Sequence, residues 1–193
     1  PSTCLPLGDA GEHADSVGQP VPCGDIRIMD DHGREVAPGE SGELWISGPM
    51  VSPGYWNNPE ANAREFTAGH WKSGDIGSMD EQGFVRIFDR KKDMINRGGY
   101  NIYSVELENL ITGHPAVVEC AVIPHPDEVL GEKIHVFVTQ VDGQELSEDD
   151  IRQFCRENLA DYKTPDYVTI QDEPLPRNAN GKLVKAGLKK RIA

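Results

Sequence analysis

Residues 176–182, Pro-Arg-Asn-Ala-Asn-Gly-Lys, place one lysine directly behind an Asn-Gly pair. Glycine adopts a positive φ without a Cβ penalty, so this pair predicts a turn that aims the side chain of Lys182. An ammonium group is a compact point charge with three donors, which suits phosphate and carboxylate oxygens. Lys182 is therefore a candidate catalytic residue, although the loop alone does not distinguish it from a solvated surface lysine.

Two residues of opposite charge lie on either side of a second predicted turn, at residues 80–83. Asp75 ends the string Trp-Lys-Ser-Gly-Asp at 71–75, and Arg90 ends the strand that follows. They could pair as a surface salt bridge of little energetic value, and the spacing alone favours this simpler interpretation. Alternatively, Asp75 could accept hydrogen bonds from the vicinal diol of a ribose, and Arg90 could donate to the same sugar or its phosphate.

Gly98 and Gly99 are adjacent and follow the charged stretch 89–93. Two neighbouring glycines can bring the backbone close to a ligand or open a narrow channel. They can also do no more than shape a turn, which is the more common case. The sequence leaves both interpretations open.

Basic side chains gather between Lys182 and Arg191, at the end of an otherwise acidic chain. Cations near the C-terminus of a helix stabilise it, which is the simpler interpretation. Alternatively, some of these charges could guide an anionic substrate such as a nucleotide or coenzyme A.

The first 90 residues have the pattern of short strands separated by turns. Alternating apolar residues predict strands at 26–29, 43–47 and 84–88, with Asp, Gly and Pro at their boundaries. A short helix is expected from about residue 58 to Phe66, with a proline in its first turn. We therefore expect an antiparallel, β-rich subdomain resembling a distorted barrel over residues 1–90.

The second half has a different pattern, which indicates a small α+β domain over residues 91–193. Ser104 is a candidate N-cap for a helix whose apolar face includes Leu107 and Ile111, and Ser147 with Asp150 is similar to a capping box. A short helix is expected at the C-terminus. Strands are expected at 117–123 (ended by Pro124), 134–141 and 167–170. These elements predict a three-stranded sheet with flanking helices.

The charged stretch 89–93, Asp-Arg-Lys-Lys-Asp, lies between the two halves and has no apolar period. Such a run is usually a solvated loop, and it is also where a hinge between two domains would lie.

Composition excludes several classes of partner. The 193 residues include 19 basic and 32 acidic side chains, for a formal charge of −13, which argues against nucleic acid. No apolar run approaches the roughly 20 residues of a membrane helix, and no secretory segment opens the chain. The four cysteines lack metal-ligand spacing, so we expect no metal site, free thiols and a cytoplasmic location. Pro1 in place of Met suggests a fragment, a processed chain or a missing leader.

Taken together, several motifs resemble those of the adenylate-forming superfamily, which includes acyl-CoA synthetases, peptide-synthetase adenylation domains and beetle luciferases. They occur in the family's order over nearly the whole chain, at residues 42–46, 54–56, 71–75, 89–93, 98–99 and 176–182. Residues 89–95 and 162–165 are most similar to fatty-acid or related acyl-CoA ligases.

The resemblance implies a role for each candidate residue. Asp75 would hold the ribose hydroxyls of ATP, and Arg90 would contact the same nucleotide. Lys92 falls where these enzymes pivot their C-terminal domain. Gly98 and Gly99 resemble the loop that lines the pantetheine tunnel. Lys182 resembles the lysine of the first half-reaction, which bridges the substrate carboxylate and the α-phosphate.

The resemblance also implies a C-terminal fragment of an acyl-CoA synthetase that uses a carboxylate, ATP, CoA and Mg²⁺. The family's phosphate-binding loop and its magnesium-binding glutamate are not in these 193 residues, so we expect the magnesium ligand outside this chain and the fragment alone to be inactive. Its partner would be the missing N-terminal domain. Two alternatives stay open: a peptide-synthetase adenylation domain that loads a carrier protein, and a non-catalytic nucleotide-binding, CoA-binding or interaction module.

Overall fold

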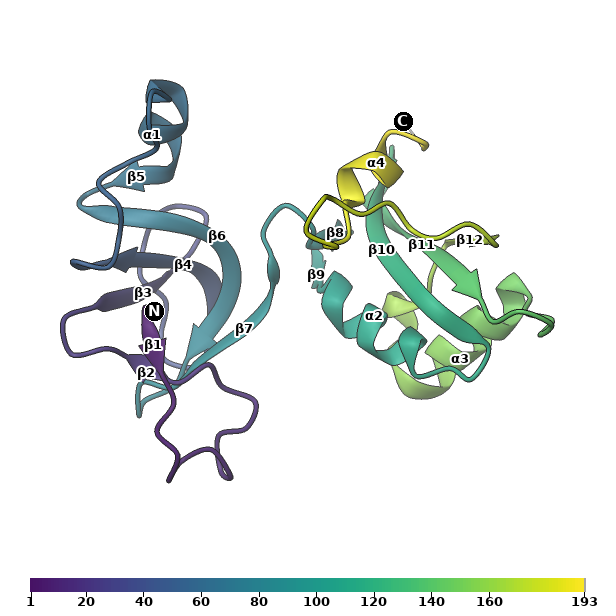
Figure 1. Ribbon diagram of the computed structural model, residues 1–193, viewed down its shortest axis with the longest axis horizontal. Helices are drawn as coiled ribbons and strands as arrows, with labels where there is room; N and C mark the ends of the chain where they lie inside the picture. Colours follow the sequence, from purple (N-terminus) through teal and green to yellow (C-terminus); the bar gives the residue numbers. More distant parts are fainter. Residues whose placement is uncertain (193) are drawn as a thin grey trace. The chain divides into compact units, whose positions relative to one another are not determined.

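The structure is a computed structural model that describes residues 1–192. The chain divides into two compact units, unit 1 from Pro1 to Lys92 and unit 2 from Asp93 to the C-terminus. Each unit has its own sheet (Figure 1). Among the described residues, no helix combines the length and apolar character that a membrane crossing requires.

Unit 1 is built on an antiparallel five-stranded sheet that curls on itself (Figure 1). The strands follow the order β3-β4-β6-β5. Strand β5 pairs with the first residues of β6, and β7 pairs with the later part of β6. Their bounds are β3 Asp25–Met29, β4 Ser41–Ser47, β5 Phe66–Thr67, β6 His70–Met79 and β7 Val85–Arg90. A separate two-stranded sheet joins β1 Thr3–Cys4 to β2 Gln19–Pro20. The strands predicted at 26–29, 43–47 and 84–88 are confirmed, as is the β-rich class of this half.

The core of unit 1 follows from alternation along its strands. Ile26 and Ile28 of β3 pair with Ile46 and Leu44 of β4, and all four side chains are buried. The predicted helix is α1, Pro59–Glu65, which begins with proline and whose N-cap Asn58 accepts a hydrogen bond from the Ala61 amide. Its position fixes the segment that leads into β6.

Strand β6 is the longest strand of unit 1, and the sequence pattern did not reveal it. Glycines and polar residues interrupt its alternation, and its pairing with β7 shifts register between Ile76 and Gly77. A Cβ atom at Gly77 would lie 2.1 Å from the Arg86 carbonyl oxygen, so only glycine permits the close approach of β7. The strand carries the 71–75 motif and brings Asp75 opposite Arg90.

Unit 2 contains a second five-stranded sheet, of order β10-β11-β8-β9, with β12 parallel to β11. The bounds are β8 Ile95–Arg97, β9 Tyr100–Ile102, β10 Val117–Asp127, β11 Gly131–Gln140 and β12 Tyr167–Gln171. The three predicted strands form its main part as β10, β11 and β12. The hairpin β8–β9 adds two short strands that the sequence analysis did not predict.

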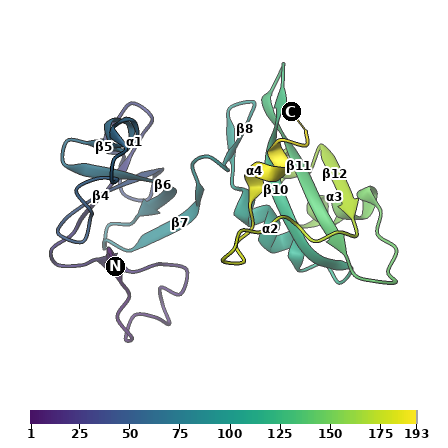
Figure 2. The same cartoon turned by 45° about the horizontal axis from the view of Figure 1, so that its top comes forward.

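Helices lie over both faces of this sheet (Figure 2), and each face carries an apolar core. Helices α2 (Ser104–Thr112) and α3 (Glu148–Asn158) bury Leu107 and Ile151 against one face. Helix α4 (Lys185–Lys189) buries Leu188 against Phe137 on the other face. A short 3-10 helix, Asp161–Lys163, precedes β12. The predicted capping box at Ser147 and Asp150 is confirmed.

Two predictions about element ends are wrong. Ser104 does not cap α2: Tyr103 is the N-cap, and Ser104 is a fully buried helical residue whose hydroxyl accepts a hydrogen bond from Lys185. Pro124 does not end its strand, because β10 continues to Asp127 through a second proline, Pro126. Within residues 1–192, strand β10 pairs only with β11, and an edge strand tolerates residues that have no amide hydrogen.

The stability of unit 2 should depend on the α2 core contact. We expect Leu107→Ala to lower the free energy of unfolding by about 2–5 kcal/mol, because it leaves a cavity in a fully buried site. Val105→Ala, on the exposed side of the same helix, should change it by less than about 0.5 kcal/mol. Urea unfolding of the chain measures both values, and equal effects would contradict the assigned core.

Candidate functional site

A groove of about 360 Å³ in unit 1 is lined by two of the predicted site residues, Arg90 and Lys92, but not by Asp75. Its walls carry four cationic side chains: Lys72 from β6, Arg90 from the end of β7, and Lys91 and Lys92 directly after it. Tyr55 and Trp71 add aromatic surface. Convergent cations beside aromatic rings suit an anionic ligand that has a planar part.

Asp75 and Arg90 face each other across β6 and β7 and form an ion pair of 3.1 Å. The hydroxyl of buried Ser73 accepts a hydrogen bond from the Asp75 amide, which fixes the backbone at this position. Over half of the Arg90 side chain is exposed, so the pair contributes little to stability. The simpler interpretation of the spacing therefore describes the structure, and Arg90 still lines the groove.

Lys91 is held in the groove by two carboxylates. Its ammonium group lies 3.0 Å from Asp31 and 3.2 Å from Glu43. Burial lowers the pKa of Lys91, but the hydrogen bonds to the two carboxylates outweigh it and raise the pKa above its usual value. The ammonium of Lys72 lies over the Trp45 ring. The sequence analysis predicted neither this contact nor those of Lys91, because the partner residues are far away in the sequence.

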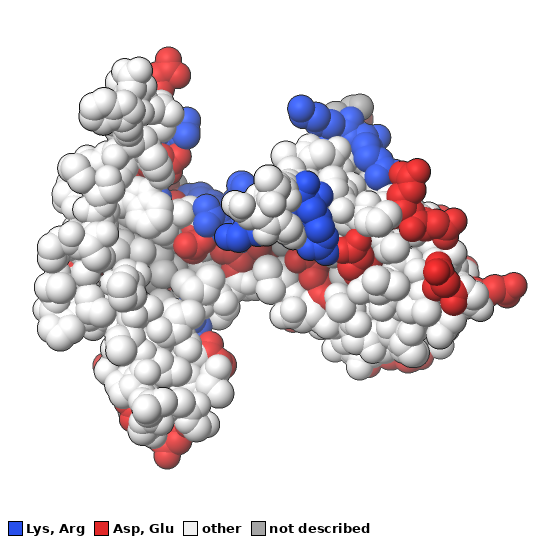
Figure 3. Space-filling view, in the orientation of Figure 1, with Lys and Arg blue, Asp and Glu red and all other residues white. Residues whose placement is uncertain are grey.

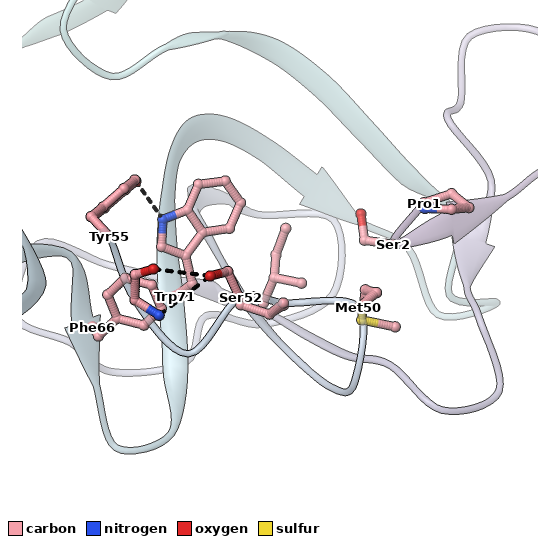
Figure 4. A pocket seen from close by; sticks show the side chains of 10 residues that line it. Pro1, Ser2, Met50, Ser52, Tyr55, Phe66 and Trp71 are labelled. Atoms are coloured by element: carbon pink, nitrogen blue, oxygen red, sulfur yellow. Dashed lines mark hydrogen bonds between the residues drawn. The ribbon is translucent and has the colours of Figure 1, made fainter. Parts of the chain in front are cut away.

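A second hollow of unit 1, of about 330 Å³, is apolar and carries none of the predicted site residues. Figure 4 shows the indole of Trp71 and the phenol of Tyr55 facing each other at its wall. The Trp71 indole N–H donates a hydrogen bond to the Tyr55 hydroxyl over 3.1 Å. These two rings separate the apolar hollow from the cationic groove, since they line both.

Gly98 and Gly99 form the two-residue turn between β8 and β9. Their φ angles are +60° and +90°, the signs required of both central residues in a type I′ turn. The Gly98 amide donates to the Leu130 carbonyl over 2.8 Å, and the Gly99 amide donates to the Asn96 side chain over 3.1 Å. The glycines thus shape a turn, as the simpler interpretation held, and the turn is attached to the β10–β11 connection.

This hairpin is also fixed by an ion pair that the sequence analysis missed. Arg97 donates two hydrogen bonds to Asp166, of 2.9 and 3.2 Å, and Asp166 also accepts the Ile134 amide. The hydrogen bonding by Asp166 raises the pKa of Arg97. Beside it, Tyr100 stacks on Tyr162 with ring centroids 4.7 Å apart. The turn is therefore presented on a rigid support.

Lys182 lies on an ordered loop, as the Asn-Gly pair predicts. The Asn178 side chain accepts hydrogen bonds from the amides of Asn180 and Lys182, and Gly181 has φ +76°. Arg177 ties the loop to Glu119 of β10. Lys182 is exposed, and the contacts of residues 1–192 include no hydrogen bond or ion pair of its ammonium group.

Most of the basic tail has internal partners. Lys185 pairs with Glu108 over 2.7 Å, and Lys189 pairs with Asp93 over 3.0 Å. Arg191 lies over the Phe137 ring, and exposed Lys190 is the C-cap of α4. Figure 3 shows Lys and Arg side chains gathered over α4 and the neighbouring C-terminal segment. The positive tail thus mainly attaches α4 to unit 2.

The structure brings the predicted residues together in unit 1 but not in unit 2. Asp75, Arg90 and Lys92 share one end of the β6–β7 pair in unit 1. In unit 2 the Gly98 turn is attached at Leu130, whereas the Lys182 loop is attached at Glu119, toward the other end of β10. Within residues 1–192, no cluster of His, Cys, Asp and Glu could hold a metal ion.

Two family models match the chain: AMP-binding enzyme over residues 1–56, and AMP-binding enzyme C-terminal domain over residues 106–182. The chain belongs to the AMP-binding, adenylate-forming enzymes. It matches their C-terminal portion, as the motifs predicted, and it spans about a third of the length of the curated relatives it matches.

Two similar enzymes form CoA thioesters by name. A long-chain-fatty-acid–CoA ligase from Yersinia pestis is 43% identical over 181 residues, which cover 94% of this chain and 32% of the relative. A feruloyl-CoA synthase from Amycolatopsis is 41% identical over 188 residues, covering 97% of this chain and 38% of the synthase.

Solved AMP-binding structures share the fold. The o-succinylbenzoate CoA synthetase of Bacillus subtilis, in complex with its acyl-adenylate intermediate, has a TM-score of 0.87 and 36% identity, covering 97% of this chain and 38% of that one. ATP-bound MatB of Rhodopseudomonas palustris has a TM-score of 0.82 and 36% identity, covering 92% of this chain and 35% of MatB. The predicted α+β class is confirmed.

The turn at Gly99 gives a test of the hairpin geometry. A Cβ atom at Gly99 meets nothing within 4 Å. Gly99→Ala should therefore lower the free energy of unfolding only by the strain of a positive φ in alanine, about 1–2 kcal/mol. Gly99→Asn should lose clearly less, because asparagine tolerates this conformation. Denaturant unfolding of both variants checks the order, and equal losses would contradict the type I′ turn.

Proposed function

We propose that this chain is the C-terminal part of an acyl-CoA synthetase of fatty-acid type. The intact enzyme would convert a carboxylate, ATP and CoA into acyl-CoA, AMP and pyrophosphate through an acyl-adenylate. The observation that carries the proposal is 43% identity to a long-chain-fatty-acid–CoA ligase over 94% of the chain. The fragment alone would be inactive, since it spans about a third of such an enzyme. A cytoplasmic location, which the four free cysteines support, belongs to the same proposal.

In this proposal the cationic groove of unit 1 receives the nucleotide. Asp75 would accept hydrogen bonds from the ribose hydroxyls, and Arg90 would donate to the same nucleotide. The lining of the groove by Arg90, Lys91 and Lys92 supports an anionic ligand. A related synthetase from Bacillus subtilis has been solved with ATP and magnesium. In the enzyme proposed here, the residue that binds magnesium would lie outside the present chain.

Unit 2 would carry the residues that change place between the two half-reactions. Residues 1–90 would be the last part of the enzyme's large N-terminal domain. Residues 91–193 would form the enzyme's mobile C-terminal domain, with Lys92 as the pivot. The division of the chain between Lys92 and Asp93 supports this. The turn at Gly98 and Gly99 would line the path of the CoA pantetheine, for which its lack of side chains is suited.

Lys182 would act in the first half-reaction. Attack of a carboxylate on the α-phosphate brings two anions together and builds negative charge at phosphorus. A positioned ammonium in a dry site stabilises that charge. The same cation has no use when a thiol attacks the acyl-adenylate, so movement of unit 2 would let one site serve both reactions.

Two alternative functions can be separated by experiment. A peptide-synthetase adenylation domain would transfer its acyl group to a carrier protein and not to free CoA. A non-catalytic module would bind ATP or CoA, or capture a protein partner, without contributing to turnover. A chimera of this chain and the N-terminal two thirds of the Yersinia pestis ligase decides: acyl-CoA formation supports the proposal, and activity with a carrier protein alone contradicts it.

In this chimera, Lys182→Ala should lower adenylate formation by about 100- to 1,000-fold, because the developing phosphoryl charge loses its cation. Thioester formation from supplied acyl-adenylate should stay largely intact. Pyrophosphate exchange and CoA transfer measure the two steps separately. Lys190→Ala removes an exposed ammonium nearby and should affect neither step, whereas an equal loss of both steps in Lys182→Ala would contradict the assigned role.

Lys92→Pro should impair thioester formation at least about tenfold more than adenylate formation, since proline restricts the φ angle on which a backbone pivot depends. Lys92→Ala removes a groove cation but keeps the backbone freedom, so it should not impair thioester formation more than adenylate formation. The same two assays apply. Unchanged CoA transfer in Lys92→Pro would remove Lys92 as the pivot.

A further inference from the structure

Two ion-pair clusters flank Lys92, one in each unit. On the preceding side, the Lys91 ammonium contacts Asp31 and Glu43 of unit 1. On the following side, the Asp93 carboxylate contacts Lys189 of unit 2. Each cluster therefore joins a neighbour of Lys92 to the body of its own unit. The sequence analysis treated residues 89–93 as one charged connection, but Asp89 and Asp93 are buried.

The unit 1 cluster fixes the chain as far as residue 91. The Lys91 amide donates to the Gly74 carbonyl over 2.8 Å, which continues the β6–β7 ladder beyond Arg90. Its ammonium reaches Glu43, whose side chain is only 11% exposed. Withdrawal of Lys91 would leave this carboxylate without the cation in a desolvated position, which is unfavourable.

The unit 2 cluster fixes the chain from residue 93 onward. The Asp93 side chain is 12% exposed and accepts a hydrogen bond of 3.0 Å from Lys189. Helix α4, which carries Lys189, is held a second time where Lys185 contacts Glu108 and the buried Ser104 hydroxyl. Two residues after Asp93, Ile95 is fully buried in the core.

We propose that Lys91, Asp93 and Lys189 are positioning residues that confine rotation between the two units to the backbone around Lys92. A backbone has two soft dihedral angles per residue. With both neighbours attached to their units, the free rotation is restricted to the angles at and beside Lys92. The inference rests on the proposed function only in assigning this rotation to the alternation of half-reactions.

The Lys189–Asp93 pair has a second consequence. Helix α4 begins three residues after Lys182, so the pair joins the start of unit 2 to the segment that bears the candidate catalytic lysine. A rotation at Lys92 would then carry the Lys182 loop as part of one rigid body. Without the ion pair, the Lys182 loop would follow a rotation at Lys92 less closely.

Hydrogen–deuterium exchange on the 193-residue chain tests the attachment. Lys91→Met should raise amide exchange about fivefold or more in peptides covering residues 88–92, and Lys189→Met should do so for residues 93–97, because each loses a local anchor. Lys190→Met, which removes an exposed neighbouring ammonium, should change neither peptide. Unchanged exchange in both test variants, or faster exchange throughout either unit, would overturn the inference.

Turnover in the chimera tests the positioning role. Lys189→Met should lower kcat about fivefold or more with KM for ATP and CoA unchanged, since Lys189 would touch neither substrate, and Lys189→Arg should restore kcat because it keeps the ion pair. An unchanged kcat, or a change in KM alone, would contradict the role. An inactive unmutated chimera would count against the proposed function, while the exchange result would still decide the anchoring.

Discussion

The antiparallel pairing of β10 with β11 is the constraint on which unit 2 depends. Side chains alternate across this ladder, so Val122 and Val136 face the α2–α3 core while Ala121 and Phe137 face the α4 core. A register slip of one residue would exchange the two faces and break both cores. Because both faces are buried, the register is fixed, and so are the segments attached to it.

The candidate site elements of unit 2 take their positions from this ladder. The Gly98 turn is bound at Leu130, where β10 turns into β11, and the Lys182 loop is bound to Glu119 near the start of β10. One rigid sheet therefore presents two chemically different elements, a bare backbone turn and an exposed ammonium. If unit 2 moves as the proposed function requires, the sheet keeps the distance between the turn and the loop constant. The movement then changes only which of the two faces the N-terminal domain.

Local chemistry could be predicted from the sequence where neighbours in the chain decide it. Alternation gave β3 and β4, the Ser147 capping box gave α3, and the Asp75–Arg90 pair followed from the hairpin that separates them. Strand β6 was missed because glycines needed for close backbone approach interrupt its pattern. The contacts of Lys91 with Glu43 and of Lys189 with Asp93 span 48 and 96 residues, and no local pattern encodes such pairs.

The same distinction explains why one lysine of the basic tail differs from its neighbours. Lys185 and Lys189 lie on α4, whose packing brings them to Glu108 and Asp93. Withdrawing either ammonium would leave a poorly solvated carboxylate without this cation, so these charges are committed to structure. Lys182 precedes the helix on a loop whose own hydrogen bonds use backbone amides and the Asn178 side chain. Its backbone is ordered, and within residues 1–192 its ammonium makes no hydrogen bond or ion pair. Under the proposed function, the charge would therefore reach a phosphate without first breaking such a bond.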